Sequence, residues 1–234
     1  MTDSKVAVVT GAAKGIGRAT AEALAGRGWN LVLLDIDDKG LRDVETTCSA
    51  AGAAVRAVAC RVENDHEVEE VFRRVVAPLE RCDLVVNCAG VGRYAEFMEL
   101  TAQDWRDMMN INVLGTVYVI RAALPLMRRQ GEGHIVMLGS QRGTQPTPAT
   151  SAYSASKAAL HGIVGSLGPD AGRYGVKVTL ICPGGVKTTF QNIAIDKKDE
   201  RFLETKDLAS IIIGVVETSH RAWVRELTIL PLGV

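Results

Sequence analysis

A glycine-rich turn near the amino terminus constrains the fold of this chain more than any other feature. The apolar run Val6–Thr10 predicts a buried strand, and the segment after it reads Thr10-Gly-Ala-Ala-Lys-Gly-Ile-Gly17. Arg18–Arg27 then places its apolar residues on one helical face. Glycines between a strand and a helix permit a tight turn, close approach of the backbone to a ligand, and close helix packing. The turn therefore predicts a strand–turn–helix unit that binds a pyrophosphate at the helix N-terminus.

The same alternation of short strands and longer helices continues along the chain. Apolar runs that predict strands follow at Leu31–Leu34, Ala54–Ala59, Leu84–Val86, Ile135–Leu138, Val176–Ile181 and Leu227–Leu230. Helical patterns cover Leu41–Ala50, Val68–Val76, Tyr153–Leu167, Leu208–Val216 and a long stretch that a capping box at Thr101-Ala-Gln-Asp104 opens and that ends near Gln130. Strands that are apolar throughout require a sheet covered on both faces. The predicted fold is α/β: a doubly wound, Rossmann-like αβα sandwich with a mostly parallel seven-stranded sheet, residues 1–234 forming a single dinucleotide-binding and catalytic domain.

Charge and cysteine content exclude several classes of partner. The 27 basic residues balance 27 acidic ones, so no overall field would attract nucleic acid or an anionic membrane. The five cysteines are odd in number and form no C-x-x-C pair, which disfavours a disulfide framework and favours reduced thiols. We find no signal-peptide core and expect no apolar run long enough to span a bilayer. A cytoplasmic protein is the resulting expectation.

Asp35, at the end of the second predicted strand, bears on the choice of cofactor. A carboxylate in this place can accept hydrogen bonds from the adenosine ribose and would repel the 2′-phosphate of NADP. Asp35 therefore favours NAD, unless it simply caps a turn. Lys14 in the glycine turn indicates the opposite preference, because it could contact that phosphate, and NADP stays an alternative.

The segment Tyr153-Ser-Ala-Ser-Lys157 lies early in a predicted helix. Residues four apart share a helix face, so the ammonium would lie beside the phenol, favour its phenolate and lower its pKa. A tyrosine of that kind is a general base near neutral pH, whereas the alternative reading is a surface pair. Ser140 ends the preceding predicted strand, where its hydroxyl could bind a substrate oxygen.

Together these motifs resemble the compact branch of the short-chain dehydrogenase/reductase family. Asn87-Cys-Ala-Gly90 resembles the family's N-N-A-G segment, and Pro183-Gly-Gly-Val-Lys-Thr188 resembles its P-G-x-V-x-T segment. Asn112 matches the asparagine that helps to hold the catalytic lysine through a water. The cofactor contacts that this resemblance implies are Gly11, Lys14, Gly15, Ile16, Gly17, Asp35, Asn87, Ala89, Gly90, Tyr153, Lys157, Pro183, Gly184, Val186 and Thr188.

The resemblance also implies a mechanism for the set Asn112, Ser140, Tyr153 and Lys157. Tyr153 would exchange the proton of an alcohol while hydride passes to or from the nicotinamide, and Ser140 would hold the carbonyl oxygen. The implied enzyme is an NAD(P)-dependent alcohol dehydrogenase or carbonyl reductase acting on a secondary alcohol or ketone, or a primary alcohol or aldehyde. The alternatives are an NADPH-dependent carbonyl reductase, an epimerase or dehydratase on the same fold, and a catalytically idle dinucleotide-sensing protein.

Two departures from the family pattern stand out. Arg61 replaces the usual aspartate that contacts the adenine amine. Pro169 falls within the helix after Tyr153 and predicts a kink or an end near residue 168. In the family this helix often forms a subunit interface, so a homodimer or homotetramer is expected with an altered assembly as the alternative.

The substrate site is the least specified part of the sequence. Arg93, Tyr94, Gln141 and Arg142 are expected to border the pocket, and arginines there would match an anionic small-molecule substrate. Their alternative reading is solvated side chains or structural ion pairs. A short substrate lid is expected at about 189–205. His134 and His161 are predicted to be structural, because no carboxylate or cysteine cluster accompanies them in the sequence, and no metal site is predicted.

Overall fold

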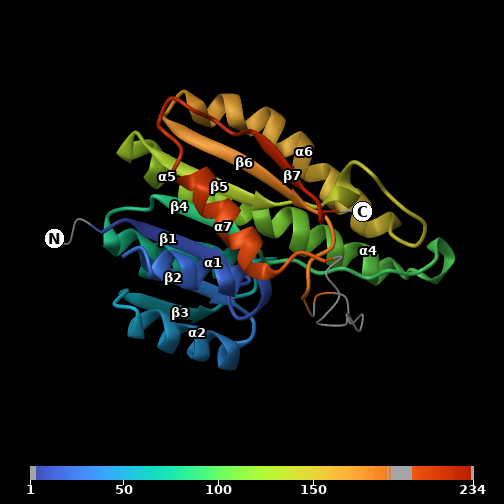
Figure 1. Cartoon of the computed structure of the whole chain (residues 1–234), viewed down its shortest axis with the longest axis horizontal. Coiled ribbons are helices and arrows are strands. Elements are labelled where there is room, and N and C mark those ends of the chain that lie inside the picture. The colour runs from blue at the N-terminus through green and yellow to red at the C-terminus, as the bar shows by residue number, and fades with distance from the viewer. Residues whose placement is uncertain (1–3, 189, 191–201, 233–234) are drawn as a thin grey trace.

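The computed structural model describes residues 4–188, 190 and 202–232, and its centre is one parallel sheet (Figure 1). The strand order is β3-β2-β1-β4-β5-β6-β7, and every neighbouring pair runs parallel. This order confirms the predicted doubly wound, Rossmann-like α/β fold with seven strands. The strands are β1 Val6–Thr10, β2 Asn30–Asp35, β3 Val55–Ala59, β4 Leu84–Asn87, β5 Gly133–Leu138, β6 Val176–Pro183 and β7 Glu226–Ile229.

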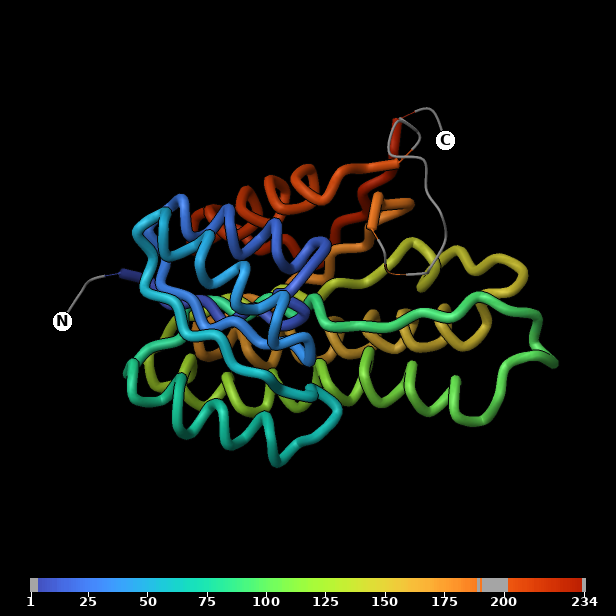
Figure 2. Tube along the Cα trace, turned by 90° about the horizontal axis from the view of Figure 1, so that it is seen from below, coloured from blue at the N-terminus to red at the C-terminus, as the bar shows by residue number. Residues whose placement is uncertain are grey.

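Helices cover both faces of the sheet, because side chains alternate along each strand (Figure 2). In β1, Ala7 and Val9 pack with one helical layer, while Val8 packs with the other. The first layer contains α1 Gly15–Ala25, α2 Asp38–Ala50 and α7 Thr205–Val216. The second contains α3 Asp65–Val71 with the π-helical turn η1 Phe72–Val76, α5 Thr116–Gln130 and α6 Ser151–Gly172.

The predicted capping box opens a long helical run. The Thr101 hydroxyl accepts the Asp104 N–H, and the Asp104 carboxylate accepts the Thr101 N–H. The run continues as α4 Ala102–Met109, the π-helical segment η4 Asn110–Gly115 and α5.

This run is long and apolar enough to pass as a membrane span, with a mean hydropathy of 1.3 in its most apolar window. The expectation that no such run exists is therefore wrong. The physical reason is packing: 44% of that window is buried inside the protein, where Val119, Ala123 and Met127 contact the sheet. Core helices of this kind meet the same criterion, so the finding is weak evidence for a membrane span.

Pro169 does not end α6, which continues to Gly172, so the predicted end near residue 168 is wrong. A proline removes the hydrogen bond to the carbonyl four residues earlier, here that of Gly165. Both Gly165 and Pro169 are exposed, so water can bind that carbonyl. On the opposite side Gly168 packs against the Trp223 ring, whose Nε1–H donates to the Val178 carbonyl at 2.8 Å. This packing holds the last turn against the sheet.

His134 is buried in β5 and is held as a neutral imidazole. The Thr179 hydroxyl donates to the Val224 carbonyl at 2.6 Å, so the His134 Nε2–H is the donor in its 2.8 Å bond to that hydroxyl. Burial, followed by the charge of Lys177, lowers the pKa of His134 from 6.5 to about 4.

This depressed pKa predicts acid sensitivity. The stabilisation is complete above the unfolded-state pKa near 6.5 and is lost as the pH falls towards 4, because only the unfolded chain binds the proton easily. Between pH 7.5 and 4.5 the His134 contribution to the free energy of unfolding should fall by about 2–3 kcal/mol. Urea unfolding at both pH values measures this change in the free energy of unfolding. His134→Gln keeps a donor for Thr179 and should flatten the pH dependence, whereas exposed His66→Gln should not; equal slopes in all three proteins would contradict the assignment.

Candidate functional site

The carboxyl ends of the central strands open on one cavity of about 560 Å³. This is the edge of a doubly wound sheet at which ligands bind. All but one of the predicted cofactor residues line the cavity, namely Gly11, Lys14, Gly15, Ile16, Gly17, Asp35, Ala89, Gly90, Tyr153, Lys157, Pro183, Gly184, Val186 and Thr188. Asn87 is buried behind the lining, and its Nδ2 has no hydrogen-bond partner among the residues that the structure describes.

The glycine turn packs directly on the loop that follows β4. Gly11 has a positive φ of 63°, and a Cβ there would lie 2.8 Å from the Ala89 nitrogen. The Thr10 hydroxyl accepts the Ala89 N–H at 3.1 Å and joins the two loops. Lys14 occupies the N-cap of α1 without a side-chain capping bond, so the first N–H groups of the helix face the cavity free of a cap. The turn thus forms a cradle for an anion, and a side chain at residue 11 would collide with the loop after β4.

Asp35 ties the glycine turn to the end of β2. Its Oδ2 accepts the Ala13 N–H and its Oδ1 accepts the Asp37 N–H, both at 3.0 Å. The carboxylate therefore caps the turn while it also lines the cavity. Each carboxylate oxygen keeps a second lone pair that can accept a ligand hydroxyl.

The residue that replaces the family's usual aspartate after β3 does not face the cavity. Arg61 does not line it; its N–H donates to Glu67 at 2.8 Å, and its exposed guanidinium lies 3.6 Å from the same carboxylate. Its neighbours Val62 and Glu63 do line the cavity. Glu63 is thus an acidic residue that the sequence analysis missed. Its signal was a carboxylate two positions beyond the place where the family usually has one.

Tyr153 and Ser140 meet at the floor of the cavity. Both side chains line the cavity, and the Ser140 hydroxyl accepts the Arg142 N–H at 3.1 Å. Burial raises the pKa of Tyr153 above its usual value, and Tyr94 adds to the rise. The Ser140 hydrogen bond and the Arg142 charge lower the pKa of Tyr153 by smaller amounts.

Lys157 is buried one helical turn after Tyr153. Its ammonium donates to the Leu138 carbonyl at 2.8 Å and lies 5.8 Å from the centroid of the Tyr153 ring. Burial lowers the pKa of Lys157 to about 8. The expectation that the lysine would bring the phenol pKa below its usual value is wrong for this structure, because the loss of solvation dominates the phenol.

Asn112 lies in η4 and joins the loop after β4 to α6. Its Oδ1 accepts the Val91 N–H at 2.8 Å, and its Nδ2 donates to the Val91 carbonyl and the Ser156 hydroxyl, each at 2.9 Å. It is fully enclosed and is not part of the cavity lining. Its side chain therefore positions the strand end relative to the helix that carries Tyr153 and Lys157.

Three of the four predicted substrate residues, Tyr94, Gln141 and Arg142, line the cavity. Arg93 does not, because its guanidinium is paired with Asp104 at 2.8 Å, as its alternative reading anticipated. The Tyr153 ring also packs against Tyr94 and Phe190, with centroids 5.5 and 5.9 Å away. Phe190 and Phe202 line the cavity and were missed in sequence, because only the fold places Phe190 beside Tyr153 and Phe202 beside Gly185. Most of the predicted lid at 189–205 lies outside the described residues.

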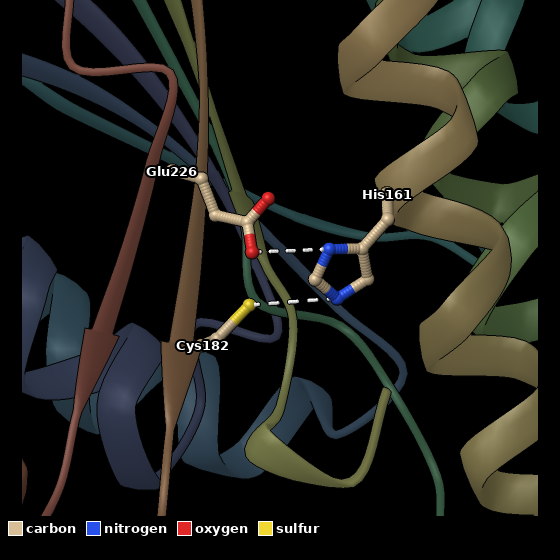
Figure 3. A group of neighbouring side chains, drawn as sticks. All are labelled: His161, Cys182 and Glu226. Carbon is tan, nitrogen blue, oxygen red and sulfur yellow. Dashed lines mark hydrogen bonds and ion pairs between the residues drawn. The ribbon is translucent and has the colours of Figure 1, made fainter. Parts of the chain in front are cut away.

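His161 has the partners that its sequence context lacked. Its Nδ1 lies 3.1 Å from the Glu226 carboxylate, and its Nε2 lies 3.9 Å from the Cys182 sulfur (Figure 3). The premise that no carboxylate or cysteine accompanies this histidine is therefore wrong. The partners come from β6 and β7, which follow His161 in the chain and pack against α6 only in the fold.

Comparison with known proteins identifies the family to which this chain belongs. Residues 5–199 match the family model described as short chain dehydrogenase. An uncharacterized oxidoreductase of Staphylococcus epidermidis is 32% identical over 228 residues, covering 97% of each chain. An uncharacterized oxidoreductase of Staphylococcus aureus is 34% identical over 232 residues, covering 99% of each chain.

Solved structures agree over nearly the whole chain. An alcohol dehydrogenase from Thermococcus sibiricus complexed with 5-hydroxy-NADP has a TM-score of 0.92 at 27% identity, covering 98% of this chain and 97% of its own. An NAD⁺-bound xylitol dehydrogenase has a TM-score of 0.88 at 26% identity, covering 97% of this chain and 98% of its own. The chain therefore belongs to the short-chain dehydrogenase/reductase family of oxidoreductases.

Proposed function

We propose that this protein transfers hydride between a nicotinamide cofactor and a small alcohol or carbonyl compound, with Tyr153 as the general acid and base. The observation that carries the proposal is that Ser140, Tyr153 and Lys157 are all buried and line the same cavity. The alcohol dehydrogenase and the xylitol dehydrogenase among the structural relatives support the same class of substrate.

The residues that would hold the cofactor follow from the shape of the cavity. The Gly11 turn and the N-terminus of α1 suit a pyrophosphate, because both line the cavity and no side chain caps the first N–H groups of the helix. Asp35 would accept the adenosine ribose hydroxyls, and the segment from Pro183 to Thr188 would hold the carboxamide of the nicotinamide. When bound, the nicotinamide supplies a carbon that accepts or donates hydride.

The side chains then divide the remaining work. In oxidation, the Tyr153 phenolate takes the hydroxyl proton of the substrate while Ser140 donates a hydrogen bond to the oxygen that becomes a carbonyl. In reduction, the phenol returns that proton. Lys157 brings a buried positive charge to the ribose side of the site. Asn112 positions α6, the helix that carries Lys157. Because burial raises the pKa of Tyr153, oxidation should accelerate as the pH rises, and reduction should be favoured at lower pH.

Asp35 favours NAD(H) in this proposal, and Lys14, which lines the same cavity, makes NADP(H) the alternative. Cytoplasmic localisation and a homodimer or homotetramer remain predictions, as does the absence of nucleic-acid and membrane partners. Of the two arginines predicted to recognise an anionic substrate, only Arg142 lines the cavity, so that prediction now rests on Arg142.

Removing the phenol hydroxyl tests the catalytic assignment. Tyr153→Phe keeps the ring contacts with Tyr94 and Phe190 but has no proton to exchange, so kcat should fall by about 10²- to 10⁴-fold. Turnover across a panel of alcohols and ketones measures the loss, and NADH fluorescence titration measures whether cofactor binding persists. Tyr94→Phe is the matched control and should lose far less activity. Wild-type binding of NADH without turnover on any compound would instead favour the dinucleotide-sensing alternative.

The cofactor assignment is tested at Asp35. Asp35→Asn keeps an acceptor oxygen for one of the two backbone N–H groups and removes the charge that would repel a 2′-phosphate. The ratio of kcat/KM for NADH to that for NADPH should be above one in the wild type and should fall about 10- to 100-fold in the variant. Lys14→Ala should move the ratio in the opposite direction. A strong wild-type preference for NADPH would contradict the role given to Asp35.

The Arg142 charge predicts a shift in the pH profile of oxidation. Since this charge lowers the pKa of Tyr153, Arg142→Gln should move the alkaline rise of kcat/KM to higher pH, by about half a unit to one unit. Arg142→Lys should restore most of the original profile. Arg93→Gln is the control, because Arg93 is paired with Asp104 away from the cavity lining. Identical profiles for Arg142→Gln and the wild type would refute the electrostatic link.

A further inference from the structure

A buried thiol lies directly behind the active site, in contact with two other groups that can bind metals. Cys182, next to the end of β6, is 1% exposed. The Cys182 sulfur and the Glu226 carboxylate lie beside the His161 imidazole, each facing one of its two nitrogens (Figure 3). One ligand atom from each of the three residues lies within 4.8 Å of the other two.

The donor set and its spacing match a borderline divalent cation. Thiolate, imidazole and carboxylate are the ligands that Zn²⁺ takes in proteins. At Zn²⁺ bond lengths of about 2.0–2.3 Å, tetrahedral ligands lie roughly 3.3–3.8 Å apart. The three ligand atoms lie within 4.8 Å of one another, so the cluster must contract around a cation, and the Glu226 side chain, 31% exposed on edge strand β7, has the freedom to move. Three protein ligands leave a fourth position for water.

The buried thiol is poorly suited to act as a free nucleophile. Burial, followed by the Glu226 charge, raises the pKa of Cys182 to about 11, while the Ser140 N–H and the Lys157 charge act in the lowering direction. A thiol with such a pKa carries little thiolate near neutral pH. A cation can still bind, because the Sγ–metal bond forms as the proton leaves Sγ for solvent. His161 and Glu226 are partly exposed and provide the route by which the ion enters.

The cluster is joined to the active site through three short connections. The residue before Ser140 packs directly on the sulfur, since a Cβ at Gly139 would lie 2.8 Å from the Cys182 Sγ. His161 lies one helical turn after Lys157. The loop that carries Arg142 rests on the imidazole, since a Cβ at Gly143 would lie 2.9 Å from the His161 Nε2. A contraction of the cluster would therefore move the backbone of Ser140 and its loop.

We propose that Cys182, His161 and Glu226 form a binding site for Zn²⁺, and that its occupation lowers turnover by displacing Ser140 and the loop that carries Arg142. The binding half of this inference is independent of the proposed reaction. The inhibitory half rests on that function.

Binding is tested on the purified full chain after treatment with EDTA and dialysis. Titration with Cd²⁺ should produce the ultraviolet absorption of a cadmium–thiolate bond, and Zn²⁺ should abolish it by competition. Cys182→Ala should lose the absorption. His161→Gln should weaken Cd²⁺ binding by at least about tenfold, and Glu226→Gln by several-fold. The matched controls are Cys48→Ala, a buried thiol in α2, and the exposed His66→Gln, and both should bind as the wild type does.

Inhibition is tested with Glu226→Gln, which lies outside the catalytic set and should have unchanged turnover without metal. Zn²⁺ should reduce wild-type turnover reversibly, with recovery on adding EDTA, and the variant should need several-fold more Zn²⁺ for the same effect. Thermal melting of each variant separates loss of binding from loss of folding. Absence of the thiolate absorption in the wild type, or its persistence in a folded Cys182→Ala protein, would overturn the site. Absorption without inhibition in an active wild-type enzyme would overturn only the coupling.

Discussion

The contact between the glycine turn and the loop after β4 is the constraint on which the rest of the site depends. Gly11 approaches the backbone of Cys88 and Ala89 so closely that a single added carbon would collide with it. Thr10 and Asp35 then fix the turn by hydrogen bonds to Ala89 and Ala13. Because β1 lies between β2 and β4, this one contact aligns the carboxyl ends of all three strands. The cavity exists because those ends meet while the N-terminus of α1 stays uncapped by a side chain.

Ser140 is the second organising residue, because its hydroxyl and its backbone face different environments. The hydroxyl lowers the pKa of the Tyr153 phenol inside the cavity, whereas the backbone N–H lowers the pKa of the Cys182 thiol behind it. Around this point Lys157 is held by the Leu138 carbonyl, and Asn112 links α6 to the β4 loop. The Tyr153 phenol is thus buried, and several elements hold the residues around it. A small displacement of one support is therefore transmitted to the others.

Most of the fold could be predicted from local sequence patterns. Apolar strands, the capping box at Thr101 and the glycine turn each depend on residues close together in the chain, so their structures could be predicted from periodicity and spacing. The less successful predictions all depended on distant residues. Pro169 stays within its helix because Trp223 packs on the opposite face, and Arg93 leaves the pocket because Asp104 neutralises it. The phenol pKa rises because the fold removes water from around Tyr153, an effect that the Lys157 spacing does not reveal.

The sequence by itself determined the strand–turn–helix unit at residue 11 and the alternation of strands and helices along the chain. It also determined which residue types lie at the floor of the cavity. These are properties of short segments. Only the tertiary structure decided which side chains share an environment. It placed Glu63 rather than Arg61 against the cavity, Phe190 beside Tyr153, and Cys182 and Glu226 around His161. These juxtapositions join segments separated by a crossover of the sheet, and burial and pairing energies arise only once such segments are packed together.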